Sequence, residues 1–227
     1  MPWNGARTQQ YFDRLSGQWA SKYSAKGSML PRIEEFVGAL AGRVSSPADV
    51  LDFGCGTGEI STACSSAGYR VCGVDQSSGM VERARRQEPG GVSFDTIASD
   101  EPLRLPYGEA CFDAVIASSV LEYVSDPARC FLELRRVSRP GTWLFFSVPN
   151  ATHWSRKVER GLKPLAGLLH PVLTQRGRNW MEYLALSVQR HPLSVWQRLL
   201  HESNWSCESV RGHETALWLV EARALRW

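Results

Sequence analysis

Several features that would indicate a membrane-spanning, secreted or metal-binding protein are missing from this 227-residue sequence. No apolar run approaches the ~20 residues that a membrane-spanning helix needs. The stretch MPWNGARTQQYFDRL is too polar for a signal peptide. The six cysteines are scattered, with no CxxC pair and no spacing typical of a metal site. We therefore expect a reduced, cytoplasmic protein without a bound metal.

A strong excess of charge of one sign is also absent. The formal net charge is only +3, which gives no indication of a nucleic-acid partner. Apolar residues make up 43% of the chain and charged residues 22%, a composition typical of globular proteins. The length suffices for one α/β domain with its own core, so we expect a single domain over 1–227.

Short apolar runs alternate with helical stretches between residues 49 and 148. Strands are expected at 49–54, 69–75, 92–98, 112–118 and 142–149, and helices at 58–67, 77–87 and 126–138. Such alternation implies crossover connections, hence parallel strands with helices on both faces. Two later runs, 205–212 and 216–224, have a short link that permits antiparallel pairing. The sequence predicts an α/β fold with a doubly wound, seven-stranded, mostly parallel, Rossmann-like sheet.

A glycine-rich loop follows the first predicted strand, where a doubly wound sheet binds its ligand. Gly54, Gly56 and Gly58 form GxGxG, whereas the dinucleotide fingerprint is GxGxxG. Glu59 stands where that fingerprint has its third glycine, and its carboxylate disfavours a pyrophosphate at the helix N-terminus. Asp52 ends the strand and suits a positively charged group. The loop alone could be a tight turn, but with Asp52 it favours a ligand that has an ammonium and no phosphate.

A second acid, Asp75, ends the second predicted strand, 17 residues after Gly58. An acid at this place accepts hydrogen bonds from ribose hydroxyls, although it could also cap the next helix. A ligand with a ribose, an ammonium and no phosphate is S-adenosylmethionine. The GxGxG spacing of the glycine loop, and the lack of a YxxxK pair, argue against a nicotinamide dehydrogenase.

Four segments together resemble the class I S-adenosylmethionine-dependent methyltransferases, in particular the small-molecule branch. They read VLDFGCGTG, VCGVDQSSGMVERAR, LPYGEACFDAVIASSVLEYVSDP and LRRVSRPGTWLFFSVPN. The resemblance covers residues 50–150 well and the C-terminal strands loosely. It implies cofactor contacts from Asp52, Gly54, Cys55, Gly56, Thr57, Gly58, Asp75, Gln76, Met80, Ser118 and Ser119.

The roles that the resemblance implies differ along the cofactor. Asp52 and the loop backbone of 54–58 would hold the methionine part, and Asp75 the ribose. Gln76 and Met80 would lie along the adenosine. Ser118 and Ser119 would lie near the sulfonium, with ordinary loop polar groups as the alternative.

Two departures from the family pattern affect the predicted site. Relatives carry an acid after the third strand that accepts a hydrogen bond from the adenine amino group. Counted forward from Val92, its position falls on Ala98 or Ser99. Counted back from Leu105, it falls on Asp100 or Glu101. Asp100 is favoured, with Ser99 supplying a hydrogen bond. Tyr123 stands where relatives often carry histidine.

The chemistry that the resemblance implies is methyl transfer to a small-molecule acceptor. A hydroxyl acceptor needs a base, and histidine is the usual one. His153 is the first candidate, because it lies five residues beyond Val148 at the carboxyl edge of the sheet; His191 and Tyr123 follow. A nucleic-acid methyltransferase is disfavoured, because its NPPY-like or PC motif is missing.

Residues 151–192 are expected to form a lid over the cofactor site. Stretch 151–190 carries seven Lys or Arg residues against Glu159 and Glu182, together with Trp154, Trp180 and Tyr183. Such a lid suits an apolar or aromatic, possibly acidic, metabolite, and it permits contact with an anionic membrane surface. The alternative is an ordinary helical insertion with a solvated basic face.

The expected organisation has four parts. N-terminal helices in 1–48 cover the cofactor site, 49–150 binds the cofactor, 151–192 is the lid, and 193–227 holds a helix and the strand pair. The predicted function is S-adenosylmethionine-dependent methyl transfer, with a hydroxyl oxygen as the favoured acceptor. Transfer to nitrogen or carbon, or a non-catalytic cofactor-binding partner subunit, are the alternatives.

Overall fold

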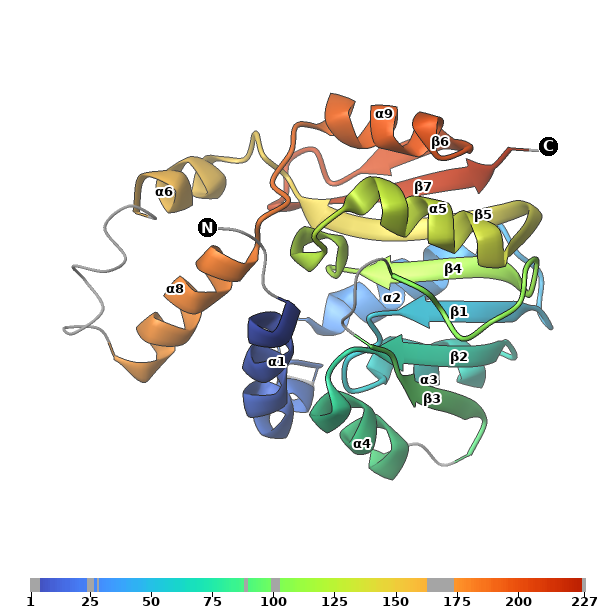
Figure 1. The fold of residues 1–227 in the computed structure, drawn as a ribbon, viewed down its shortest axis with the longest axis horizontal. Coiled ribbons are helices and arrows are strands. Elements are labelled where there is room, and N and C mark those ends of the chain that lie inside the picture. Colours follow the sequence, from blue (N-terminus) through green and yellow to red (C-terminus); the bar gives the residue numbers. More distant parts are fainter. Residues whose placement is uncertain are drawn as a thin grey trace.

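A seven-stranded sheet forms the centre of the protein in the computed structural model, which describes residues 5–23, 27, 29–87, 90–98, 103–162 and 174–225 (Figure 1). Its strands are β1 (Asp49–Phe53), β2 (Arg70–Asp75), β3 (Val92–Thr96), β4 (Phe112–Ser118), β5 (Ser138–Pro149), β6 (Trp205–Arg211) and β7 (Leu217–Ala224). The spatial order is β3-β2-β1-β4-β5-β7-β6. Only β7 runs antiparallel to its neighbours β5 and β6. The predicted mostly parallel, Rossmann-like sheet is confirmed.

Helices cover both faces of the sheet because its central strands are apolar on both sides. The main elements are α1 (Gly5–Trp19), η1 (Ala20–Tyr23), α2 (Leu30–Ala41), α3 (Glu59–Ser66), α4 (Ser78–Gln87), η2 (Leu121–Tyr123), α5 (Pro127–Val137), α6 (Trp154–Leu162), α8 (Gln175–Leu186) and α9 (Leu193–Glu202). Val50 of β1 packs in one cluster with α2 and α3, and the next residue, Leu51, packs in another with α5 and α9. In Figure 1, α5 and α9 lie in front of the sheet and α2 and α3 behind it.

The binding crevice is positioned by the order of the strands. The chain adds β2 and then β3 on one side of β1, and returns through β4 on the other side. This reversal leaves an opening at the carboxyl ends of β1 and β4, where doubly wound folds bind ligands. Asp52 and Asp75, near the ends of β1 and β2, both lie at this edge.

The N-terminal helix α1 crosses this edge and docks on α4. Asp13 accepts hydrogen bonds from the Ser77 hydroxyl at 2.6 Å and from the Gly79 amide at 3.0 Å. Ser77 in turn caps α4, because its hydroxyl accepts from the Met80 amide at 3.1 Å. The dock fixes α1 over the start of α4.

The stretch between β5 and α9 contributes α6 and α8, which lie beyond the carboxyl edge of the sheet (Figure 1). The end of α8 is fastened to η2 through the backbone, because the amides of Val188 and Gln189 donate to the Glu122 carbonyl at 2.9 and 3.1 Å. Tyr11 of α1 also donates to the Asn179 carbonyl of α8 at 3.3 Å. Among the described helices, none is both long and apolar enough to cross a membrane.

Candidate active site

A cavity of about 920 Å³ opens at the carboxyl edge of the sheet, between the glycine loop and helices α1, α6 and α8. Its volume is near the upper end of the ~300–1,000 Å³ usual for ligand pockets. Of the predicted cofactor contacts, the cavity is lined by Asp52, Gly54, Cys55, Gly56, Asp75, Gln76, Met80, Ser118 and Ser119. The structure therefore brings together residues from three separate stretches of the sequence.

The three glycines of the loop all have positive φ, but they serve different purposes. A Cβ on Gly54 would lie 2.5 Å from Cγ2 of Val120, and one on Gly58 would lie 2.7 Å from Cζ of Phe94. A Cβ on Gly56 would meet nothing nearer than Nε1 of Trp19 at 3.6 Å. Gly54 and Gly58 are required by packing, whereas Gly56 presents bare backbone to the cavity.

Two of the predicted cofactor contacts point away from the cavity. Thr57 donates its hydroxyl to the Glu59 carboxylate at 2.6 Å and does not line the cavity, and neither does Gly58. Gly58 instead lets α3 start close to Phe94 of β3. The structure therefore does not bring Thr57 and Gly58 to the cavity wall, and both shape the turn from behind. Their contact with the cofactor stays a prediction. Ser99 and Asp100, predicted to contact adenine, lie outside the described residues.

Asp52 is a buried carboxylate on the floor of the cavity. Its Oδ2 accepts a hydrogen bond from the Ser61 hydroxyl at 2.6 Å. Burial, and then the neighbouring charges of Asp75 and Glu59, raise the pKa of Asp52 to about 7, although the Ser61 hydrogen bond opposes the shift. A buried acid that has no ion pair with a cation among the described residues favours binding of a ligand cation here.

Asp75 links the glycine loop to the end of β2. Its Oδ2 accepts from the Gly56 amide at 2.9 Å and its Oδ1 from the Ser77 amide at 2.8 Å. Burial raises the pKa of Asp75 to about 6, and these two amides limit the shift. Each oxygen keeps a second lone pair, so the carboxylate can accept two further hydrogen bonds from a ligand.

The wall beside β4 carries an unsatisfied polar atom. The Ser118 hydroxyl is buried and has no hydrogen-bond partner among the described residues. Ser119, with φ of 52°, donates its amide to the Ser147 hydroxyl at 3.0 Å. The Ser118 hydroxyl is free for a ligand, whereas Ser119 is held by β5.

Helix η1 and the start of α2 add two cations that the sequence analysis did not single out. The Lys22 ammonium lies 3.5 Å from the centre of the Trp19 ring. Burial, and then the nearby Arg32, lower the pKa of Lys22 to about 8. No ion pair among the described residues engages Lys22 or Arg32, and both line the cavity. They can hold a ligand carboxylate.

The opposite end of the cavity is aromatic. Phe12 of α1 contacts Tyr123 edge to face, with ring centres 5.1 Å apart, and Tyr123 contacts Tyr183 of α8 at 6.3 Å. Trp180 and Tyr11 complete this lining. Burial raises the pKa of Tyr123 well above its usual value, so this phenol stays protonated and cannot act as a base at neutral pH.

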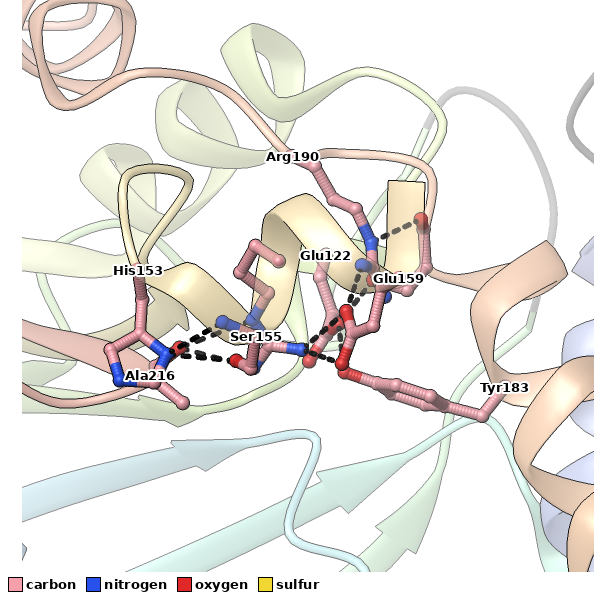
Figure 2. Close-up of polar contacts among 9 residues, drawn as sticks. Glu122, His153, Ser155, Glu159, Tyr183, Arg190 and Ala216 are labelled. Atoms are coloured by element: carbon pink, nitrogen blue, oxygen red, sulfur yellow. Dashed lines mark hydrogen bonds and ion pairs between the residues drawn. The ribbon is translucent and has the colours of Figure 1, made fainter. Parts of the chain in front are cut away.

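A buried carboxylate, Glu122, faces this aromatic end. Its Oε2 accepts hydrogen bonds from the Ser187 hydroxyl and, at 3.2 Å, from the Tyr183 hydroxyl (Figure 2). Burial raises the pKa of Glu122, while the hydrogen bond from Ser187 and the charge of Arg190 oppose the shift. A carboxylate with a raised pKa at a cavity wall can accept a proton.

The two candidate histidines do not reach the cavity. The Nδ1 atom of His153 lies 2.8 Å from the Ser155 hydroxyl and accepts from the Ser155 amide at 3.3 Å, so His153 caps α6 (Figure 2). His191 bonds to Gln189 at 2.6 Å and packs against Trp196, with ring centres 5.5 Å apart. Neither lines the cavity. The structure therefore does not bring these two histidines to the cavity, and their role as base stays a prediction that nothing in its geometry supports.

The fold and cavity define a class: a Rossmann-like domain of the kind that binds S-adenosylmethionine. Residues 51–146 match the family model described as "Methyltransferase domain". A demethylmenaquinone methyltransferase of Renibacterium salmoninarum is 36% identical over 190 residues, which is 79% of this chain and 73% of that protein. The chain belongs to the class I S-adenosylmethionine-dependent methyltransferase family. The predicted enzyme class and its cofactor are confirmed.

Other relatives match over less of their length. A demethylmenaquinone methyltransferase of Clavibacter sepedonicus is 33% identical over 66% of this chain and 63% of that protein. A ubiquinone biosynthesis O-methyltransferase of Thiobacillus denitrificans is 36% identical over 44% of each. Both matches span less than two thirds of the relative. The fold resembles that of magnesium protoporphyrin IX methyltransferase of Synechocystis PCC 6803, solved with bound SAH, at a TM-score of 0.71, 19% identity, and coverage of 97% of this chain and 100% of that chain.

Sequence reasoning missed Glu122, Lys22 and Arg32 as lining residues. Glu122 is the only charged residue in SSVLEYVS, between the fourth strand and the next helix, so a signal was present. Lys22 and Arg32 carried no such signal in the sequence, because no local pattern indicates that η1 and α2 reach the cavity.

Proposed function

We propose that the protein transfers the methyl group of S-adenosylmethionine to a hydroxyl oxygen of an apolar aromatic small molecule. The observation that carries this proposal is a single cavity with two chemically different ends. Asp52 and Asp75 line one end, and the rings of Phe12, Tyr123 and Tyr183 line the other. A polar cofactor and an aromatic acceptor can meet inside it.

The cofactor fits the acidic end. Asp52 would face its ammonium, Asp75 would accept from the ribose hydroxyls, and Lys22 with Arg32 would hold its carboxylate. The open space at Gly56 and the unsatisfied Ser118 hydroxyl support contacts there. When bound, S-adenosylmethionine supplies a methyl group that its sulfonium already activates, so the protein has to align the acceptor and exclude water.

The acceptor fits the aromatic end. Rings that meet edge to face favour an aromatic ligand. Relatives named for demethylmenaquinone and for ubiquinone biosynthesis support a quinol as the acceptor. The six free cysteines support a reducing compartment, which we propose to be the cytoplasm.

A hydroxyl acceptor must lose its proton as its oxygen bonds to the methyl carbon. Among the described lining residues no histidine is available, and Glu122 is a lining carboxylate that accepts a hydrogen bond from the aromatic Tyr183. We assign Tyr183 to pass the acceptor's proton to Glu122. Tyr183 would take the acceptor's proton as it gives its own to Glu122, so one proton would end on the carboxylate and the tyrosine would be unchanged. The acceptor's oxygen would bond to the methyl carbon that the sulfonium would release.

The test incubates the protein with S-adenosylmethionine and short-chain prenylated quinols. One set carries an additional hydroxyl group on the ring, and the other set lacks a methyl group on the ring. Mass spectrometry should show the gain of one methyl group on a hydroxyl oxygen. Glu122→Gln should lose about 10²–10⁴-fold in turnover at neutral pH and recover as pH approaches the acceptor's own pKa. The backbone carbonyl of Glu122 keeps its bonds to the lid in this variant, so folding should persist.

A second candidate is methylation at a ring carbon, favoured by the demethylmenaquinone methyltransferase that matches 79% of this chain. The position of the methyl group in the product separates the two. S-Adenosylhomocysteine binding without turnover of any quinol would instead support a non-catalytic partner subunit.

A further inference from the structure

Helix α6 has an inner face that is fixed to the rest of the protein (Figure 2). Arg156 pairs with Glu159 at 2.8 Å and donates to the Ala216 carbonyl at 3.0 Å, just before β7. Glu159 also pairs with Arg190 at 2.5 Å. Arg156 lines the cavity, so the inner face of α6 is part of the cavity wall.

The outer face of α6 is apolar and basic. The exposed fractions of Trp154 and Val158 are 69% and 51%. These two residues are four apart and so share one side of the helix. Lys157 and Arg160 are exposed beside them. We call these four residues the outer patch.

Neither acid of 151–190 balances the outer patch. The two acids of 151–190 are both engaged elsewhere: Glu159 pairs inward with Arg156 and Arg190, and Glu182 pairs with Arg14 of α1. No ion pair among the described residues engages Lys157 or Arg160. The patch therefore has positive charge next to an exposed indole ring.

We propose that the outer patch docks the protein on the surface of an anionic lipid bilayer. Lysine and arginine are attracted to anionic headgroups, and tryptophan favours the headgroup level because its ring is amphipathic. The exposed Trp154 and Val158 favour lipid over nucleic acid or an acidic protein, which the basic residues alone would attract. The exposure and the charge of the outer patch support the docking by themselves. Only its purpose, admitting an apolar acceptor from the bilayer to the cavity behind α6, rests on the proposed function.

The experiment measures co-sedimentation with vesicles of phosphatidylcholine containing about one third phosphatidylglycerol, and with phosphatidylcholine alone. The whole chain should bind the anionic vesicles and be released by salt. Lys157→Glu with Arg160→Glu should weaken binding at least about 25-fold. Arg86→Glu with Arg198→Glu is the control, because both arginines are exposed on other helices and net charge changes equally.

The contribution of the indole ring is tested separately. Trp154→Ser should weaken vesicle binding about tenfold. Leu132→Ser, at a leucine of α5 that is 50% exposed, should leave binding unchanged. S-Adenosylhomocysteine titration of the whole chain and of every variant reports the cofactor site. Failure of the whole chain to bind S-adenosylhomocysteine counts against the proposed function and not against the outer patch.

Three results would overturn the docking surface. The first is failure of the whole chain to sediment with anionic vesicles. The second is an equal loss in the Arg86 and Arg198 control. The third is binding to heparin as tight as to vesicles with no effect of Trp154→Ser, which would indicate a polyanion partner instead of lipid.

Discussion

The pH dependence of cofactor binding should follow the ionisation of Asp52. Because its pKa is raised to about 7, about 9% of Asp52 is ionised at about pH 6 and about 76% at about pH 7.5. A ligand ammonium pairs with the ionised form only, so affinity should rise about eightfold over this interval, or about 1.2 kcal/mol. Asp75, with a pKa of about 6, should add about a twofold rise.

Calorimetric titration with S-adenosylhomocysteine at the two pH values tests this. Asp52→Asn should lose affinity at the higher pH and keep a rise of about twofold or less, because Asp75 gains its charge over this interval while Lys22, with a pKa of about 8, begins to lose its own. Ser61→Ala removes the hydrogen bond that lowers the pKa of Asp52, so the midpoint should move to higher pH. An affinity that is the same at both pH values, or a pH dependence unchanged in Asp52→Asn, would refute the assignment of Asp52 to the ammonium.

Three further predictions concern the loop, the ribose and the histidine. Gly56→Val should abolish cofactor binding in calorimetry at a moderate cost in thermal stability, because a φ of 56° strains a branched residue. Gly54→Val should destabilise the fold more, because its side chain would also meet Val120; normal binding by Gly56→Val would contradict this. Asp75→Ala should weaken binding by about 1–3 kcal/mol through loss of a buried acceptor, and unchanged affinity would count against the ribose role. His153→Ala should leave turnover within about threefold, because His153 caps a helix; a loss of 100-fold or more would restore it as a base.

The sheet could be predicted from the sequence because each strand and helix is a local pattern. Regular alternation of apolar runs implies crossovers, and crossovers imply a parallel sheet with its ligand at the carboxyl edge. Asp52 and Asp75 were found for the same reason, since each ends a strand that the apolar pattern marks. The strand 112–118 has the same bounds in the sequence prediction and in the structure.

The direction in which a side chain points was not predictable. Thr57 and Gly58 lie in the same loop as Gly56, yet they face Glu59 and Phe94 and not the cavity. His153 lies at the expected edge of the sheet, but the next helix uses its ring as a cap. Spacing along the chain determines the edge on which a residue lies, whereas backbone torsion and competing hydrogen bonds determine the atom it meets.

The sequence by itself determined the fold class, the position of the glycine loop and the two acids that follow β1 and β2. Only the tertiary structure decided the acceptor side. Glu122 meets Tyr183 and Ser187 more than 60 residues away, and Tyr11 meets Asn179 across 168 residues. Such pairs leave no periodic trace in the chain, because they depend on how α1 and α8 pack over the sheet and not on local propensity.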